Sequence, residues 1–261
     1  GGVDLPVFRQ HDIPLLPSSG IKGALRWATE PPSDAARARR EWQDLFGPEF
    51  DRDAAQSGQA SIMGFGDGTL LALPVPSLKG LLAWATTPML LARYRLLAAD
   101  HGVTTPTDPL DYVQPAECVA SPQCIVNVAD RSVVVAKDLD LSVKKDEKTD
   151  AALAAWQRHI AERWFPPSFQ GFFKERLMVV HETAMHYLLL HCTDVRPRIR
   201  RDVDGTVAAK MHWYEEYLCP HTLFALPWWT QRIAQANTSA SAAGRWFARQ
   251  KDSGLSLPMP P

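Results

Sequence analysis

The spacing of apolar residues in the first third of the chain predicts helices and a strand. Apolar positions 21, 24, 25 and 28 recur at i, i+3, i+4 and i+7, which is the period of an amphipathic helix over residues 18–29. Ser18 or Ser19 can cap that helix, and a charged second helix is predicted over residues 33–46. The apolar run 70–77 predicts a buried strand that ends in a helix cap at Ser77.

Strands and helices alternate in the rest of the chain. Residues 126–136 and 177–180 predict strands, and helices are predicted at 151–164 and directly after residue 180. Residues 137–150 are rich in Lys and Asp and predict a charged, mobile insertion. Polar and apolar positions then alternate on both sides of the turn dipeptide Asp204-Gly205, which predicts a β-hairpin over residues 194–213.

Two nine-residue segments of the chain resemble one another. IKGALRWAT (21–29) and LKGLLAWAT (78–86) share six residues at matched positions, and each follows a turn that contains Pro and Ser. We interpret them as the same helix start used twice, as in duplicated ferredoxin-like units. The alternative is chance similarity between two amphipathic helices.

Composition limits the classes of protein to which this chain can belong. With 261 residues, 46% hydrophobic and 22% charged, it is an ordinary globular chain, and no apolar run reaches the roughly 18 residues of a membrane span. A formal net charge of −1 excludes a general nucleic-acid binder, so any RNA contact must come from local basic clusters. Four cysteines without CxxC spacing argue against a zinc site or disulfide scaffold and favour a reducing cytoplasm.

The start of the first predicted helix is a candidate anion site. Lys22 and Arg26 share one helix face, and the free N–H groups after Ser18 and Ser19 point along the positive end of the helix dipole. A phosphodiester is a natural occupant of such a site. A solvated basic face with an ordinary cap explains the same residues equally well. In the second nine-residue segment only Lys79 remains of the basic pair.

The predicted hairpin is a second candidate for RNA contact. Arg196, Arg198 and Arg200 alternate with apolar residues and therefore lie on one side of the first strand. In the second strand, Met211 shares a face with Val207, Ala209 and Trp213. A ribbon that is basic on one side and apolar on the other can follow an RNA backbone while wedging between bases. An amphipathic hairpin packed on a core is the alternative.

Asp4 is the third candidate, although the sequence around it is short. It lies between a Gly pair and a Pro, which predicts a turn or strand end near the surface. Such a carboxylate usually satisfies its own turn, but it can also position a 2′-OH or a metal-bound water for RNA cleavage.

No metal ligands are assigned, since His181, His186 and His191 at five-residue spacing do not share a helix face. No nucleotide-binding loop or hydrolase triad is found.

Four stretches of the chain resemble the backbone subunits of the Cmr complex, the type III-B CRISPR effector, which belong to the RAMP superfamily of guide-RNA-binding proteins. They are GGVDLPVFRQHDIPLLPSSGIKGALR (1–26), LFG (45–47), LLALPVPSLKGLLAWATTPMLLARY (70–94) and residues 177–225. The resemblance implies an α+β fold with a modified ferredoxin-like (RRM-like) palm and an inserted β-hairpin thumb. The thumb would be the 194–213 hairpin, within one RAMP domain over residues 1–261.

The resemblance also implies a function. Such subunits bind guide RNA as a filament of their own copies, together with other Cmr-type subunits, and act as endoribonucleases that cut target RNA at regular intervals. By position, Asp4 matches the family's acidic residue for a metal-dependent cut, which implies Mg²⁺ or Mn²⁺ as cofactor. Lys22 and Arg26 would hold the guide backbone. Two alternatives remain: a non-cleaving structural subunit that makes the same contacts, and an unrelated α+β protein that dimerises through the hairpin.

Overall fold

The computed structural model describes residues 3–48, 60–107, 110, 113–121, 123–129, 132–136, 138–144, 146–201, 207–231 and 246. Among them, no helix combines the length and the apolar composition that a bilayer span requires. Their contacts separate into two compact units. The first unit comprises Gly1–Leu15 and Thr69–Ala225, and the second comprises Leu16–Gly68 and Leu226–Pro261. One domain over residues 1–261 stays a prediction, because two compact units can belong to one domain.

The helices and strands are assigned here to the unit that holds most of their residues. The helices of the first unit are α3 (Pro88–Asp100), α4 (Glu147–Trp164), α5 (Pro167–Lys174) and α6 (Glu182–His191). Its strands are β1 (Arg9–Gln10), β2 (Ile13–Leu16), β4 (Gly68–Ser77), β5 (Leu81–Thr86), β6 (Glu117–Ala120), β7 (Asn127–Ala129), β8 (Ser132–Val135), β9 (Leu139–Val143), β10 (Leu177–Val180), β11 (Thr193–Arg201), β12 (Val207–Leu218) and β13 (Leu223–Ala225). The second unit holds α1 (Ser18–Ala28), α2 (Ala36–Phe46), β3 (Met63–Phe65) and β14 (Trp228–Thr230).

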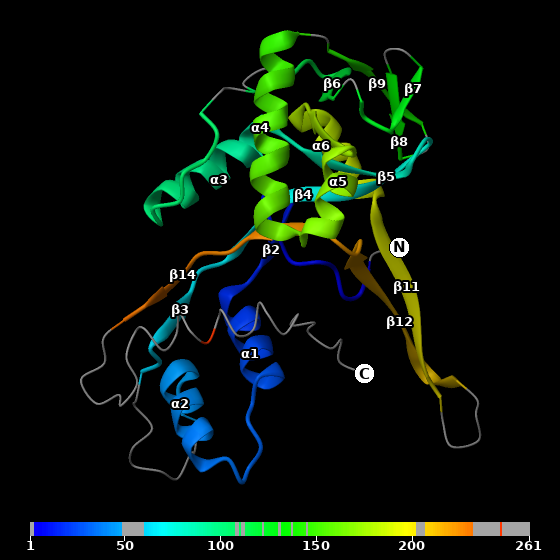
Figure 1. The fold of residues 1–261 in the computed structure, drawn as a ribbon. Helices are drawn as coiled ribbons and strands as arrows, with labels where there is room; N and C mark the ends of the chain where they lie inside the picture. Colours follow the sequence, from blue (N-terminus) through cyan, green and yellow to red (C-terminus); the bar gives the residue numbers. More distant parts are fainter. Residues whose placement is uncertain are drawn as a thin grey trace. The chain divides into compact units, whose positions relative to one another are not determined.

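A mixed sheet forms the centre of the first unit (Figure 1). Its strand order is β1-β2-β4-β5-β10-β6-β9-β8-β7, and β13 pairs with β4. β5 and β10 run parallel, whereas β4 and β6 flank them in antiparallel pairing. α3 follows β5 and α6 follows β10. The α+β class is confirmed, and two helices that follow neighbouring parallel strands are consistent with the predicted ferredoxin-like palm.

Apolar side chains leave both faces of this sheet, because successive residues of a strand point in opposite directions. Ala83 and Met178 pack in one core with α6, and Trp84 and Leu177 pack in the other with α3, α4 and α5. Trp84 is the centre of the second core and has no solvent exposure. Phenylalanine rings surround it at centroid distances of 5.3–6.2 Å, and they are Phe165, Phe169, Phe172 and Phe173.

The two similar nine-residue segments have different structures, so their interpretation as a repeated helix start is wrong. Residues 21–28 lie in α1, whereas residues 81–86 form β5. Ser77 ends β4 at a tight turn, not at a helix, and pairs with Leu81. Gly80 (φ 78°) and Leu81 (φ 67°) take left-handed backbone angles there, which reverse the chain direction. Pairing with strands on both sides overrides the local sequence pattern.

The segment predicted as a charged, mobile insertion, residues 137–150, contains a strand of the sheet instead. β9 pairs with β8 on one side and with β6 on the other, and α4 begins at Glu147. Leu141 is fully buried in β9, while Asp140 and Ser142 are exposed. The alternation that marks a half-buried strand is therefore present, but charged neighbours hide it. Residues 126–136, predicted as one strand, contain β7 and β8.

Other elements agree with the sequence. The helices predicted at 18–29 and 33–46 are confirmed as α1 and α2, and the helix predicted at 151–164 lies within α4. The strand at 177–180 is β10, and α6 follows it.

The second unit has a small aromatic core, in which Trp42 and Phe46 of α2 pack with Trp246. Neither Ser18 nor Ser19 caps α1 with its side chain, so the predicted serine cap is wrong. The backbone N–H of Ser18 donates instead to Asp67 Oδ1, at 2.8 Å. A carboxylate of the protein itself therefore occupies part of the helix start that the sequence offers to a phosphate.

Candidate nucleic-acid interface

The predicted hairpin is confirmed as β11 and β12, which are longer than the predicted range (Figure 1). The strands pair antiparallel, with Arg196 opposite Glu215 and Arg198 opposite Trp213. Asp204 and Gly205, the predicted turn, lie outside the described residues. The side chain of Met211 does too, although its backbone belongs to β12.

One face of the hairpin carries the arginines, together with acidic partners. Arg196 bonds to Asp194 at 2.6 Å, and Arg198 donates to Glu215 at 2.9 Å and to the Tyr217 hydroxyl at 2.6 Å. Tyr217 also donates a hydrogen bond to Glu215. Bonds from Tyr217, Trp213 and Arg198, in that order, lower the pKa of Glu215 to about 2. The charges of Arg196 and Arg198 are thus compensated within the hairpin, while Arg200 is exposed farther along the strand.

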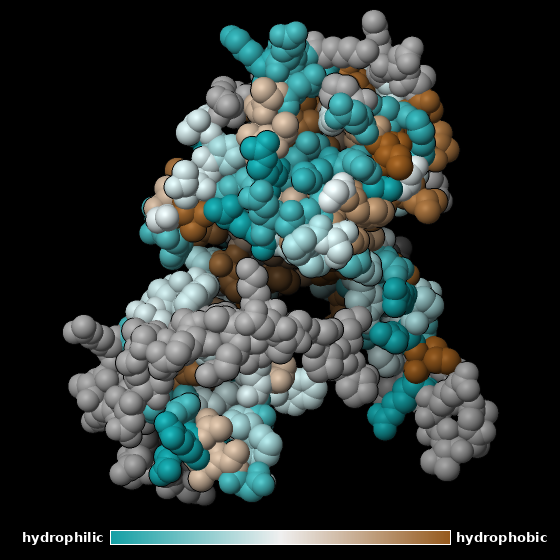
Figure 2. Space-filling view, viewed as in Figure 1, coloured by the Kyte–Doolittle hydropathy of each residue, from teal (hydrophilic) through white to brown (hydrophobic). Residues whose placement is uncertain are grey.

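The opposite face of the hairpin exposes apolar and aromatic side chains. Val195 is 46% exposed and Ile199 is 48% exposed, and Ile199 pairs across the strands with His212. His212 and Tyr214 lie edge to face, with ring centroids 5.3 Å apart. Figure 2 shows this mixture of polar and apolar surface along the hairpin. The hairpin therefore has one arginine-rich face and one more apolar face. The predicted place of Trp213 on the apolar face is wrong, because Trp213 pairs with Arg198 and lies among the arginines.

Asp4 lies at the edge of the hairpin. Its carboxylate Oδ2 accepts a hydrogen bond from the backbone N–H of Tyr214 at 2.8 Å. The next residue, Leu5, makes an isolated parallel β-bridge to Glu215, in which Leu5 N–H donates to the Tyr214 carbonyl at 3.1 Å. The Asp4 side chain is exposed. A solvent-accessible carboxylate is thus held against the hairpin by the segment that follows it.

A partly buried ion pair fastens this segment to β12. Arg9 donates to both carboxylate oxygens of Glu216, at 2.7 and 2.5 Å, and Val7 N–H donates to Glu216 Oε2 at 2.9 Å. The Glu216 side chain is 9% exposed. The hydrogen bond from Arg9 lowers the pKa of Glu216 to about 2. The position of Asp4 therefore depends on a bidentate arginine–carboxylate pair, which is geometrically specific.

Lys22 and Arg26 do share a face of α1, but both contact the protein. Lys22 donates to the Ser61 hydroxyl, and burial, followed by the nearby charge of Arg26, lowers the pKa of Lys22. Arg26 donates to the Pro48 carbonyl at 3.2 Å and lies 4.8 Å from the centre of the Trp42 ring. Each side chain is half-buried, so part of each remains accessible to an anion.

The remaining predicted RNA contacts lie at separate places. Ser18 is half-buried and Ser19 is exposed at the start of α1, whereas Lys79 is exposed in the turn between β4 and β5. The structure keeps Ser18, Ser19, Lys22 and Arg26 together in the second unit, and Lys79 lies in the first unit with Asp4 and the hairpin.

Sequence reasoning missed the acidic partners of the hairpin. Glu215 and Glu216 are adjacent, so they point to opposite faces of β12: one toward Arg198, the other toward Arg9. Two neighbouring acids in a strand that faces an arginine-rich strand were the available signal. The partner of Glu216 carries no such signal, because Arg9 is 207 residues away in the sequence.

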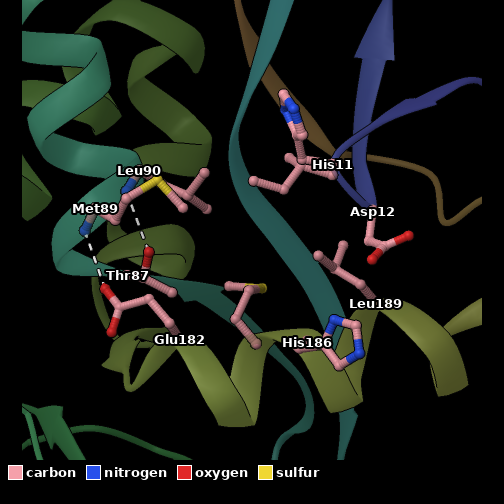
Figure 3. Close-up of a pocket in the computed structure, with 10 residues that line it drawn as sticks. His11, Asp12, Thr87, Met89, Leu90, Glu182, His186 and Leu189 are labelled. Carbon is pink, nitrogen blue, oxygen red and sulfur yellow. Dashed lines mark hydrogen bonds between the residues drawn. The ribbon is translucent and has the colours of Figure 1, made fainter.

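A pocket of about 150 Å³ lies elsewhere in the first unit, between the β1–β2 turn and helices α3 and α6 (Figure 3). His11 and Asp12 form that turn with left-handed backbone angles, φ 50° and 64°. Glu182 accepts from Met89 N–H at the start of α3, at 3.3 Å. The pocket is mostly apolar, and its acidic side chains do not suit a phosphate. The lining residues are His11, Asp12, Ile13, Thr87, Met89, Leu90, Glu182, Met185, His186 and Leu189.

Comparison with known proteins assigns the chain to a family. A model of the RAMP superfamily matches residues 1–247, so the chain belongs to that superfamily. It is 28% identical over 228 residues to the CRISPR system Cmr endoribonuclease Cmr4 of Pyrococcus furiosus. That alignment covers 86% of this chain and 72% of the relative.

Solved structures share the fold. The crystal structure of oligomeric Cmr4 from Pyrococcus furiosus matches with a TM-score of 0.72 and 22% identity, over 100% of this chain and 86% of that one. A cryo-EM structure of the type III-B Cmr-beta complex bound to cognate target RNA contains a chain that matches with a TM-score of 0.63 and 16% identity. That match covers 93% of this chain and 79% of the other. The likeness extends over nearly the whole chain.

Proposed function

We propose that this protein is a backbone subunit of a cytoplasmic type III-B Cmr effector that binds guide RNA and cuts complementary target RNA at regular intervals. It would assemble as a filament of its own copies with other Cmr-type subunits. The observation that carries the proposal is the exposed Asp4 carboxylate, held at the edge of the β11–β12 hairpin in a chain of RAMP fold. The relative from Pyrococcus furiosus, which is named an endoribonuclease, supports it.

The hairpin and the carboxylate suit RNA transesterification. A hairpin that wedges between bases unstacks a target nucleotide, which frees its 2′-oxygen to approach the neighbouring phosphorus in line. The carboxylate of Asp4 takes the 2′-OH proton while the 2′-oxygen–phosphorus bond forms. The phosphorus–5′-oxygen bond breaks, and the 5′-oxygen takes up a proton. The products are a 2′,3′-cyclic phosphate end and a 5′-hydroxyl end.

The grip on RNA would come from the predicted basic residues. Arg200 and Lys79 are exposed, so a phosphate can reach them directly. Arg196 and Arg198 would exchange Asp194 and Glu215 for phosphate oxygens, which can accept two parallel hydrogen bonds from one guanidinium group. Ser18, Ser19, Lys22 and Arg26 would hold the guide through α1, and Met211 would contribute to the wedge.

A divalent cation, Mg²⁺ or Mn²⁺, is a separate part of the proposal. The described residues contain no group of three or more His, Cys, Asp or Glu side chains that can hold a metal. A preformed protein metal site therefore does not fit these residues, and the mechanism above takes no step through a metal. If a complex treated with a chelator still cuts at the full rate, the reaction does not need a divalent cation. The proposed role of Asp4 would be unaffected by that result.

The decisive experiment replaces Asp4 in the assembled complex. Asp4→Asn keeps the size of the side chain but removes the base, so we expect target cutting to fall by about 10²–10⁴-fold. Binding of the target should not change, because the amide oxygen can still accept from Tyr214. Gel analysis of labelled target and filter binding measure the two quantities. Asp12→Asn is the matched control, since Asp12 is exposed in the same N-terminal segment.

Two results would contradict the cutting role. Equal cutting by the Asp4→Asn and wild-type complexes would remove Asp4 from the reaction. A wild-type complex that binds and protects RNA without cutting it would favour the alternative, a structural backbone subunit.

A further inference from the structure

His212 contacts the ring of Tyr214, the residue whose backbone holds Asp4, and it makes no contribution to the mechanism above. It precedes Tyr214 by two residues on β12, so both side chains lie on one face of the hairpin. The imidazole is exposed, and its ring lies edge to face with the ring of Tyr214. The backbone of the same Tyr214 holds the carboxylate of Asp4.

We propose that His212 is the general acid of the cleavage reaction. This inference rests on the proposed function, with Asp4 as the base. As the phosphorus–5′-oxygen bond breaks, the protonated imidazole donates its proton to the departing 5′-oxygen. The protonated Asp4 carboxyl then releases the 2′-OH proton to water, and the neutral imidazole takes up one proton from water, so both groups return to their starting state.

The spacing along β12 suits an acid and a base acting on one phosphodiester. In-line displacement places the entering and leaving oxygens on opposite sides of the phosphorus, so the two groups must flank it. Two residues of a strand span about 7 Å. That distance separates the His212 and Tyr214 positions along β12, and Asp4 is bonded to Tyr214. A scissile linkage lying along the strand edge would have the carboxylate at one end and the imidazole at the other.

The other titratable groups of the hairpin are less suited to this role. Glu215 and Tyr217 belong to the opposite face and are bonded to Arg198. Glu216 is paired with Arg9, and with a pKa of about 2 it carries no proton to donate. Imidazole is the side chain that both gives and takes protons near neutral pH.

The test uses the assembled complex and a target whose scissile 5′-oxygen is replaced by sulfur. A thiolate leaves without protonation, so a sulfur-bridged target needs no general acid. For the ordinary target, we expect His212→Gln to slow cutting by about 10²-fold. For the sulfur-bridged target, His212→Gln and wild type should cut at the same rate. Asp4→Asn should be slow on both targets, because the base is still needed.

The outcomes separate this inference from the proposed function. Slow cutting of both targets by His212→Gln, or full-rate cutting of the ordinary one, would show that His212 is not the acid. Fast cutting by Asp4→Asn would overturn the proposed function instead, and with it the pairing of the two residues. His101→Gln, at the exposed end of α3, is the control and should match wild type on both targets. Guide retention by the His212→Gln complex shows that the variant assembles.

Discussion

Two tryptophans at matched positions of similar segments show how burial, rather than sequence, sets the role of a residue. Trp27 in α1 is 61% exposed, whereas Trp84 in β5 is fully buried among four phenylalanine rings. The indole N–H of Trp84 also donates to the His221 carbonyl at 3.1 Å. Six of the nine residues are the same in both segments, yet one segment forms helix α1 and the other contains strand β5, which pairs within the central sheet.

This contrast gives a prediction for stability. Trp84→Ala should lower the free energy of unfolding by about 3–5 kcal/mol, because it leaves a large cavity in the core. Trp27→Ala should change it by less than about 0.5 kcal/mol, as expected of an exposed residue. Urea denaturation of the two variants measures both values. Similar losses in the two variants would mean that the two segments have similar environments after all.

For some candidate site residues the sequence predicted the strand face correctly, but it did not predict their contacts with distant parts of the chain. The arginine alternation on β11 follows from the strand period, and the structure confirms it for Arg196 and Arg198, whereas the strand register shifts between Ile199 and Arg201, at Arg200. That Asp4 touches Tyr214 does not follow from local pattern, since 210 residues separate the two. Likewise, nothing in the α1 sequence shows that Ser61, Pro48 and Trp42 engage its basic residues. Local periods predict faces, and only folding decides what covers them.

At the scale of elements, the hairpin and the N-terminal segment act together. Residues 5–9 run beside β12 and are held by the Leu5 bridge and the Arg9–Glu216 pair. A two-stranded hairpin alone is marginal in water, so contacts with another segment stabilise it. The segment that carries Asp4 therefore also supports the hairpin that is proposed to displace the target base.

Removal of the ion pair should loosen this segment. Glu216→Gln should lower the free energy of unfolding by about 1.5–3 kcal/mol, the usual value of hydrogen bonds to a charged group. The hydrogen exchange of the Val7 and Leu5 amides should become faster, because both amides bond to this part of β12. Hydrogen exchange followed by mass spectrometry of the N-terminal peptide measures the effect.

A second glutamate provides the control for this prediction. Glu41 pairs with Arg37 on the surface of α2 at 3.4 Å, and exposed pairs of this kind contribute little. Glu41→Gln should leave the exchange of the N-terminal peptide unchanged. Unchanged exchange in Glu216→Gln as well would mean that the Leu5 bridge alone holds the segment.

At the scale of the whole molecule, the class of fold was predicted better than the pairing of strands within the sheets. Helices α1 and α2 and the hairpin carry clear local periods, and β10 is a short, fully buried apolar run. The short strands β1, β2, β13 and β14 were not predicted, since each has four residues or fewer. Three of them, β2, β13 and β14, also pair with strands that are distant in the sequence. β9 was taken for an insertion because its charged residues face solvent. Strands of this kind are defined by their partners, which local patterns do not reveal.

The fold also buries a histidine that should make the molecule sensitive to acid. His159 of α4 is 8% exposed, and its Nε2 lies 2.8 Å from the Tyr94 hydroxyl of α3. Burial, with a smaller effect of the Arg163 charge, lowers the pKa of His159 from 6.5 to about 4. The folded protein thus keeps His159 neutral where the unfolded chain binds a proton. The resulting stabilisation is complete above pH 6.5 and is lost as the pH falls to about 4.

A double variant isolates this effect from other acid sensitivity. Tyr94→Phe with His159→Leu removes both partners, so neither is left buried without a hydrogen bond. Between pH 7 and pH 5, the urea midpoint of the wild type should fall, and that of the double variant should fall less. The Arg9–Glu216 pair does not contribute in this interval, because the pKa of Glu216 moves from 4.5 to about 2. An equal fall in both proteins would place the acid sensitivity outside the α3–α4 contact.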